Sequence, residues 1–223
     1  MVFEVNDSLE AKIGTGVMLG HIVRTLTKKS VKGLESLIGV PGTLGGALIM
    51  NAGAYGSEIS NYLVSIKSIS LDGKEKLYFK DDLDFSYRYS SIPKNEIVVE
   101  AKFKFEIGSL NQIKIKKEKA SQSRRENQPL QFRSAGSIFK NPNINMAAGY
   151  LIDQANLKGI RIGDAEISTK HANFIINHGN ASSDNIIKLI KIIKKEVFLK
   201  FKINLELEVK LMGFNSVELE GIA

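Results

Sequence analysis

Three polar residues at separated positions have the chemistry to stabilise an anion or to move a proton. Arg88 lies among aromatic and hydroxyl residues in FSYRYSS, where a guanidinium can hold a carboxylate or stabilise an enolate. Ser137 lies in the small-residue turn SAGSIFKNP, and a serine hydroxyl can protonate a strongly basic carbanion or enolate. Glu208 shares one face of an expected strand, ELEVK, with Glu206. Each also has a plainer interpretation, respectively a surface arginine, a turn serine and a solvated acidic edge.

A glycine-rich segment, GVPGTLGGALIMNAGAYG, covers residues 39–56 and contains six glycines and one proline. It has too many glycines for an ordinary helix. Because glycine tolerates positive φ and has no side chain, the amides of such a segment can approach a phosphate or a flat ring. The spacing matches neither the GxGxxG dinucleotide pattern nor the GxxxxGK[ST] phosphate loop. The residues alone leave two interpretations open, a ligand cradle and a set of tight turns between buried strands.

Other reactive groups are scarce in this chain. It has no cysteine, which excludes disulfides and thiolate chemistry, and its three histidines make a multi-histidine metal site unexpected. We therefore predict no metal ion. The segment STKHANF places Lys170 and His171 directly before a buried strand. No GxSxG motif is present, so a serine hydrolase is not indicated.

Composition limits the class of protein and its partners. The chain has 223 residues, of which 43% are hydrophobic, enough for one or two domains with a real core. No apolar run reaches the roughly 18 residues of a membrane span, and no secretory signal opens the sequence, so we expect a soluble cytoplasmic protein. The net charge of +7 comes from dispersed lysines. Dispersed charge favours a solvated surface over a nucleic-acid interface, and we expect neither nucleic acid nor membrane as a partner.

The first half of the chain has the patterns of strands with one helix. Apolar residues at helical spacing predict a helix over 17–30, and the Asp72-Gly73 pair predicts a hairpin within 62–79. Alternating residues predict a strand before a turn at Gly14–Gly16 and another strand over 96–105.

The second half has an α+β pattern. The expected elements are helices over 111–127, 146–159 (stopped by Gly159) and 182–201 (capped by a serine), and strands over 172–177 and 203–213. We place a domain boundary near residue 108, which divides the chain into domains 1–107 and 108–223.

Seven motifs, taken in order, resemble the UDP-N-acetylenolpyruvoylglucosamine reductase family. They are GLESLIGVPGTLGGALIMNAGAYGSEI, FSYRYS, RRENQP, SAGSIFKNP, AAGYLIDQANLKG, STKHANFIIN and LELEV, and together they span residues 33–209. The resemblance implies an α+β fold in which the C-terminal part of an FAD-binding domain of the PCMH/vanillyl-alcohol-oxidase type precedes a smaller α+β substrate-binding domain.

The same resemblance implies FAD and NADPH as cofactors and assigns residues to them. The expected flavin neighbourhood is Pro41, Gly42, Thr43, Gly45, Gly46, Asn51, Gly53, Ala54 and Gly56. The expected substrate contacts, for UDP-N-acetylglucosamine enolpyruvate, are Arg125, Lys140, Asn141 and His171. The expected catalytic residues are Arg88, Ser137 and Glu208.

In the implied reaction, Arg88 and a protonated Glu208 stabilise an enol-like intermediate, and Ser137 delivers a proton to the substrate's α-carbon. The family's first FAD subdomain, which carries a Gly-Ser-Asn phosphate loop, has no counterpart in this sequence. The 49 positions from Arg88 to Ser137 resemble the family form without an extra substrate loop. We expect a monomeric reductase, or alternatively a remnant that binds UDP-sugar without retaining flavin. A purified protein that is yellow favours the first, and a colourless one that still binds UDP-sugar favours the second.

Overall fold

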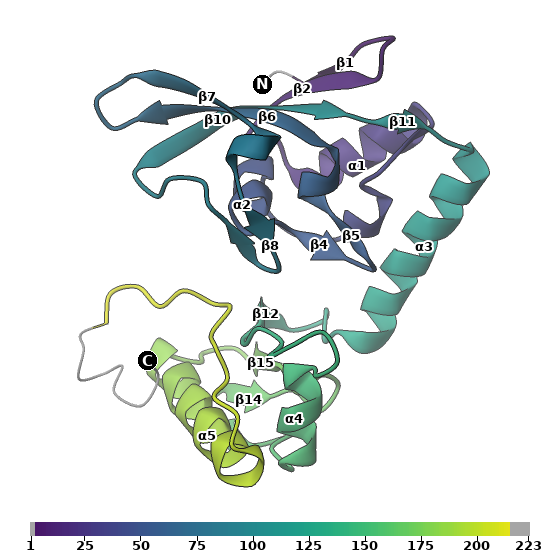
Figure 1. Cartoon of the computed structure of the whole chain (residues 1–223). Coiled ribbons are helices and arrows are strands. Elements are labelled where there is room, and N and C mark those ends of the chain that lie inside the picture. Colours follow the sequence, from purple (N-terminus) through teal and green to yellow (C-terminus); the bar gives the residue numbers. More distant parts are fainter. Residues whose placement is uncertain (1–2, 215–223) are drawn as a thin grey trace. The chain divides into compact units, whose positions relative to one another are not determined.

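A five-stranded antiparallel sheet forms the framework of the first half of the chain. The computed structural model describes residues 3–214. In the sheet the strands lie in the order β1-β2-β10-β6-β7 (Figure 1). Their bounds are Phe3–Val5 (β1), Glu10–Gly14 (β2), Leu63–Ser70 (β6), Glu75–Phe79 (β7) and Glu96–Lys104 (β10). The expected hairpin is confirmed, because Gly73, with a φ of 85°, lies in the turn between β6 and β7.

Two helices bury apolar side chains against this sheet. In α1 (Leu19–Lys28) the buried side chains of Leu19, Ile22, Val23 and Leu26 confirm the helical spacing seen in the sequence. The second helix, α2 (Leu44–Ile49), lies inside the glycine-rich segment, where no ordinary helix was expected. Leu44, Ala47 and Leu48 recur at helical spacing and are buried in the core, and this burial outweighs the low helix propensity of two glycines.

Short elements complete the first half. They are β3 (Val31–Lys32), β4 (Gly53–Ala54), β5 (Ser57–Glu58), β8 (Phe85–Ser86), β9 (Tyr89–Ser90), β11 (Glu106–Ile107) and the 3₁₀ turns η1 (Glu35–Leu37), η2 (Ile59–Tyr62) and η3 (Lys80–Asp82). Strands β4 and β5 pair as a hairpin, and β8 and β9 pair as a second one; each of these strands has two residues. A long helix, α3 (Leu110–Asn127), follows β11.

A four-stranded antiparallel sheet organises the second half, in the order β12-β15-β14-β13. Its strands are β12 (Arg133–Ser137), β13 (Arg161–Ile162), β14 (Ala165–Ile167) and β15 (Phe174–Asn177). Helix α4 (Ala148–Gln154) contacts α5 (Ser183–Phe201), which lies along β13 and β14 (Figure 1). The expected serine cap is confirmed: Ser182 Oγ accepts the Asn185 N–H, and the Asn185 side chain accepts the Ser182 N–H.

Two sequence predictions in the second half were wrong. Helix α4 ends at Gln154, before the expected stop at Gly159, because Asn156 takes a φ of 59° and its N–H donates to the Asp153 carbonyl. Residues 203–213 form no strand; they make one isolated bridge, from Leu207 to Phe139. A further difference lies near the N-terminus, where the single expected strand is the β1–β2 hairpin.

The chain divides into two compact units, the first ending at Arg124 and the second beginning at Arg125. The division therefore falls near the end of α3, whereas the sequence suggested a boundary before that helix; a functional boundary near residue 108 stays a prediction. Within residues 3–214, no helix is both long and apolar enough to cross a membrane.

Candidate functional site

The glycine-rich segment exposes a bare stretch of backbone in the first unit. Gly42, Gly46 and Gly56 are exposed, and a Cβ built on any of them would meet no atom within 4 Å. Of the other residues expected near flavin, Pro41 is exposed, Asn51 is buried, and Thr43, Gly45, Gly53 and Ala54 are half-buried. A flat ligand can therefore approach the backbone closely at the three exposed glycines.

Two amides of this segment are already used inside the protein. The N–H of Leu44 donates to the Val17 carbonyl, and the N–H of Gly45 donates to the Thr15 carbonyl, both over 2.9 Å. A Cβ on Gly45 would lie 3.2 Å from Thr15 Cβ, so this glycine allows a close approach within the fold. Hence any cradle of successive amides excludes these two.

Asn51 is the most buried polar residue of the segment. Asn51 follows Met50, the C-cap of α2, and has a φ of 41°; its N–H donates to the Leu48 carbonyl and ends the helix. The side-chain amide donates to Glu58 Oε2 over 2.7 Å and to the Ser86 carbonyl over 3.1 Å. Gly53 leaves room for the same Glu58, since a Cβ there would be 2.9 Å from Glu58 Cγ.

Arg88 occupies the turn of the β8–β9 hairpin. It is half-buried, has a φ of 56°, and its guanidinium lies 4.9 Å from the centre of the Tyr87 ring. The hairpin is tied to the end of α2 by two hydrogen bonds, from Asn51 to the Ser86 carbonyl and from Ser90 Oγ to the Ile49 carbonyl. The first unit therefore brings the Arg88 turn and the glycine-rich segment together.

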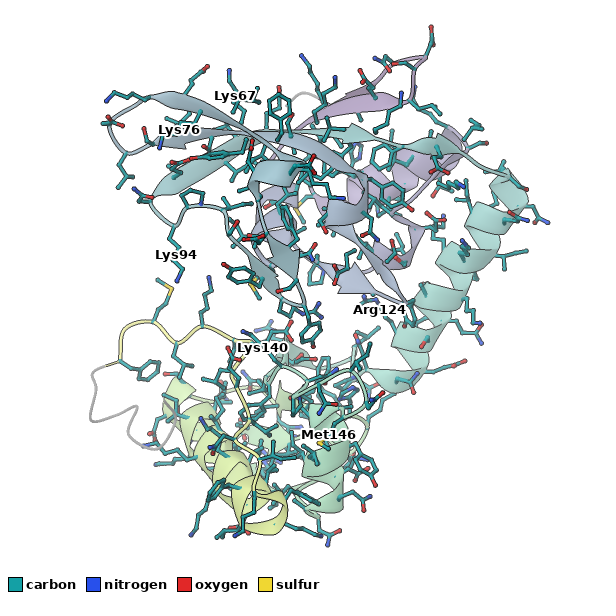
Figure 2. The ribbon with its side chains drawn as sticks, viewed as in Figure 1. Lys67, Lys76, Lys94, Arg124, Lys140 and Met146 are labelled. Carbon is teal, nitrogen blue, oxygen red and sulfur yellow. The ribbon has the colours of Figure 1, made fainter. Side chains whose placement is uncertain are left out.

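Arg124 is a cation of the same region that sequence reasoning missed. It lies near the end of α3 (Figure 2), and its buried Nε has no hydrogen-bond partner among the described residues. A Cβ built on Gly39 would lie 3.1 Å from Arg124 Cδ, so this glycine allows Arg124 to approach the glycine-rich segment closely. Burial, together with the nearby Arg88, lowers the pKa of Arg124, while Tyr55 opposes this effect. The family resemblance suggests the neighbouring Arg125, which is exposed, as a substrate contact, and that assignment stays a prediction.

In the second unit, backbone pairing brings Glu208 beside the Ser137 turn. The Glu208 N–H donates to the Ile138 carbonyl over 2.8 Å, and the Lys140 N–H donates to the Glu206 carbonyl over 2.9 Å. Residue 208 thus lies opposite the neighbour of Ser137. Both Ser137 and Glu208 are half-buried. The structure therefore brings together two of the three residues expected to be catalytic; the third, Arg88, belongs to the first unit.

Asn173 holds this turn and was also missed from the sequence. It is buried, and its side chain accepts the Phe139 N–H over 2.9 Å and donates to the Phe139 carbonyl over 2.8 Å. Its own carbonyl accepts the Ile138 N–H over 2.9 Å. The only available signal was its position in STKHANF, beside a buried strand.

The expected substrate residues of the second unit have different surroundings. Lys140 Nζ forms an ion pair with Glu206 Oε1 over 2.6 Å (Figure 2 shows Lys140). Asn141 Oδ1 accepts the Ala148 N–H over 3.1 Å, so it caps the start of α4. His171 Nδ1 accepts the Asn173 N–H over 3.2 Å, and burial lowers the pKa of His171 below its ordinary value. Arg125 is exposed, and its carbonyl accepts Lys170 Nζ over 2.7 Å.

Comparison with known families finds two matching sequence profiles. The profile described as FAD binding domain matches residues 1–76. The profile described as UDP-N-acetylenolpyruvoylglucosamine reductase, C-terminal domain, matches residues 128–212. The expected α+β fold, with a flavin-binding domain before a reductase C-terminal domain, is confirmed by these matches.

Individual relatives are proteins named UDP-N-acetylenolpyruvoylglucosamine reductase. The chain is 40% identical to the Agathobacter rectalis protein over 201 residues, 90% of this chain and 64% of that protein. It is 43% identical to the Clostridium novyi protein, covering 91% and 66%, and 40% identical to the Aquifex aeolicus protein, covering 95% and 70%. The crystal structure of the Thermus caldophilus enzyme matches with a TM-score of 0.79 and 35% identity, covering 89% of this chain and 71% of that one. The chain thus spans slightly less than two thirds of the first two relatives.

Proposed function

Because the chain belongs to the UDP-N-acetylenolpyruvoylglucosamine reductase family, we propose that it acts in the FAD- and NADPH-dependent reduction of UDP-N-acetylglucosamine enolpyruvate to UDP-N-acetylmuramate. This reaction serves peptidoglycan synthesis. The observation that carries the proposal is the backbone pairing of Glu208 with Ile138, which brings the segment that carries the expected carboxyl group next to the turn that carries the expected proton donor, Ser137. Both substrates of such a reaction are cytoplasmic metabolites, and we propose the cytoplasm as its location.

Flavin chemistry requires a surface that holds the cofactor. The bare backbone at Gly42, Gly46 and Gly56 fits the close approach of a flat ring, and the FAD-binding profile covers all three positions. When bound, FAD would supply the acceptance of a hydride from NADPH and its delivery to the enolpyruvyl group. The protein would supply position and charge.

The proposed roles of the chain's own residues follow from their charge and proton content. Arg88 is a fixed cation that can stabilise negative charge on the substrate carboxylate. Glu208, if protonated, can share that charge through a hydrogen bond. Ser137 would give its proton to the substrate's α-carbon. Lys140 would contact the UDP phosphates after leaving Glu206.

The first test is flavin retention, which separates the reductase from the alternative. The purified chain is titrated with FAD by isothermal calorimetry and inspected for visible flavin absorbance. Bound flavin supports the reductase. A colourless protein that still binds UDP-N-acetylglucosamine would identify the second unit as a UDP-sugar-binding module. The use of the Leu44 and Gly45 amides inside the fold favours that alternative, because it reduces the donors available to a pyrophosphate.

The second test assigns the proton. In the flavin-loaded protein, Ser137→Ala should leave flavin reduction by NADPH nearly unchanged and slow substrate reduction by about 10²- to 10⁴-fold. Ser137→Cys should recover part of the rate, because a thiol also donates a proton. Stopped-flow absorbance follows the two half-reactions separately. Equal slowing of both would show that Ser137 is a structural turn residue.

A further inference from the structure

The turn that contains Arg88 has a backbone conformation that is unusual for a two-residue β-hairpin turn. Tyr87 and Arg88 form the turn between the closing pair Ser86 and Tyr89, and of the two only Arg88 has a positive φ. The turns that suit hairpin twist have positive φ at the first central residue or at both. Here the left-handed position is the second one, and it holds an arginine where glycine or asparagine is usual. Such a conformation persists only when the surroundings impose it.

The surroundings do so through one tie to each strand of the hairpin. On β8, the Ser86 carbonyl accepts the Asn51 amide over 3.1 Å. On β9, Ser90 Oγ donates to the Ile49 carbonyl over 2.9 Å. Both ties end within two residues of each other, at the C-terminal end of α2. The two strands are thus fixed to a single rigid point instead of to each other alone.

Asn51 is itself held firmly enough to act as that point. Its side chain is fully buried, and its second amide proton is donated to Glu58 Oε2 over 2.7 Å. Its Oδ1 accepts the Ser60 N–H over 3.4 Å. The following N–H, of Ala52, donates to the Ala47 carbonyl, which with the Asn51 N–H completes a helix-ending motif. Glycine would serve this backbone equally well, so the backbone alone gives no reason for an asparagine.

We propose that Asn51 is a positioning residue for Arg88: its side-chain amide holds the β8–β9 turn in the strained conformation that presents the guanidinium. Asn51 acts through Ser86 and does not itself contact the substrate. Ser90 provides the second tie. The inference rests on the proposed function for the role of Arg88, but the tie and the strain are properties of the first unit alone.

The decisive experiment measures hydrogen exchange in residues 85–91 of the whole chain. Asn51→Gly preserves the left-handed backbone and removes both side-chain donors, so amides in that segment should exchange about tenfold faster. The matched control is Asn156→Gly, which makes the same replacement at the equivalent position after α4, where φ is 59°. Exchange in the β6–β7 hairpin serves as the internal reference for global opening.

A second variant covers the case in which Asn51→Gly unfolds the first unit. Ser90→Ala removes only the other tie and should raise exchange in 85–91 alone, by a smaller factor. The proposal is overturned if the amides of residues 85–91 exchange at the same rate in the Asn51→Gly and Asn156→Gly variants. It is also overturned if Asn51→Gly raises the exchange rate of the β6–β7 hairpin by the same factor as that of residues 85–91. If the Asn51→Gly variant does not fold, the proposal is overturned when Ser90→Ala leaves the exchange rates of residues 85–91 unchanged.

The functional readout separates positioning from folding. In flavin-loaded protein, Asn51→Gly should slow substrate reduction at saturating substrate, as Arg88→Ala should. Ser90→Ala, at a residue outside the expected flavin neighbourhood, should slow the same step by a smaller factor and leave flavin reduction by NADPH within about twofold of the parent. Equal slowing of both half-reactions in Ser90→Ala overturns the positioning role. If the parent chain neither binds flavin nor reduces substrate, the proposed function fails, and the hydrogen-exchange comparison still decides whether Asn51 holds the turn.

Discussion

The two units each use a buried asparagine to hold the loop that carries a proposed catalytic residue, but they use it differently. Asn173 binds both the N–H and the carbonyl of Phe139, and its own backbone extends the pairing to Ile138. Asn51 donates to the Ser86 carbonyl, one residue before the turn that contains Arg88. At Asn173, the side-chain hydrogen bonds continue the pairing of β12 with β15 beyond the last paired residues of these strands. At Asn51, one hydrogen bond fixes the position of β8. We therefore expect substitution of Asn173 to lower the free energy of unfolding, and substitution of Asn51 to displace the turn that contains Arg88.

The largest expected effect tests the second unit. Asn173→Ala leaves both buried polar groups of Phe139 without a partner and should destabilise the second unit by about 3 kcal/mol. Urea unfolding, read together with hydrogen exchange in β15, measures the loss. Asn180→Ala, at an exposed position in the same unit, is the control and should change stability by less than about 0.5 kcal/mol. A loss below about 1 kcal/mol for Asn173→Ala would contradict the ladder-like role.

The next effect tests the strain in the first unit. Glycine accepts a positive φ without cost, whereas alanine does not, so Arg88→Gly should be more stable than Arg88→Ala by about 1 kcal/mol. Urea midpoints of the two variants give the difference. The same pair at the exposed Lys94, whose φ is not positive, is the control (Figure 2 shows Lys94). There the glycine variant should be the less stable one; a similar order at both sites would show that the Arg88 turn is unstrained.

A smaller effect depends on pH and again concerns the second unit. Burial, with a contribution from Lys158, lowers the pKa of His171 below 6.5, and its Nδ1 accepts the Asn173 N–H only in the neutral ring. The unfolded chain then binds the proton at higher pH than the folded one. This contribution to stability is therefore complete above pH 6.5 and is lost as the pH falls toward the lower pKa of the folded state. Urea midpoints at pH 7.5 and 5.5 should differ less in His171→Gln than in the parent chain, and an unchanged difference would exclude His171 as the cause.

The smallest effect concerns the ion pair between Lys140, a proposed substrate residue, and Glu206. Glu206 is 74% exposed at its side chain, so Glu206→Gln should change stability by less than about 0.5 kcal/mol. The substitution releases Lys140 and should tighten binding of UDP about twofold at low salt, with the gain disappearing at high salt. Calorimetric titration at two salt concentrations measures it. Asp184→Asn removes the same charge from the exposed Lys188–Asp184 ion pair of α5, so it provides a charge-matched comparison and should change binding little. Weaker binding in Glu206→Gln would show that Glu206 positions Lys140 for the ligand.

The amino-acid sequence by itself determined the local elements of this protein. The apolar spacing of α1 and α5, the Ser182 cap and the Asp72-Gly73 hairpin each depend on residues within a few positions of one another, and all are present in the structure. The motifs also identified the family, because their order along the chain needs no coordinates.

Only the tertiary structure decided which polar groups act together. Asn173 meets Phe139 across 34 positions, Asn51 meets Ser86 across 35, and Glu208 meets the Ser137 turn without forming the expected strand. Burial likewise made a helix of Leu44–Ile49 despite its glycines, and distinguished the half-buried Arg124 from the exposed Arg125. The physical reason is the same in each case. The free energy of a buried hydrogen bond or an apolar contact depends on partners distant in the chain, which local periodicity and turn chemistry do not encode.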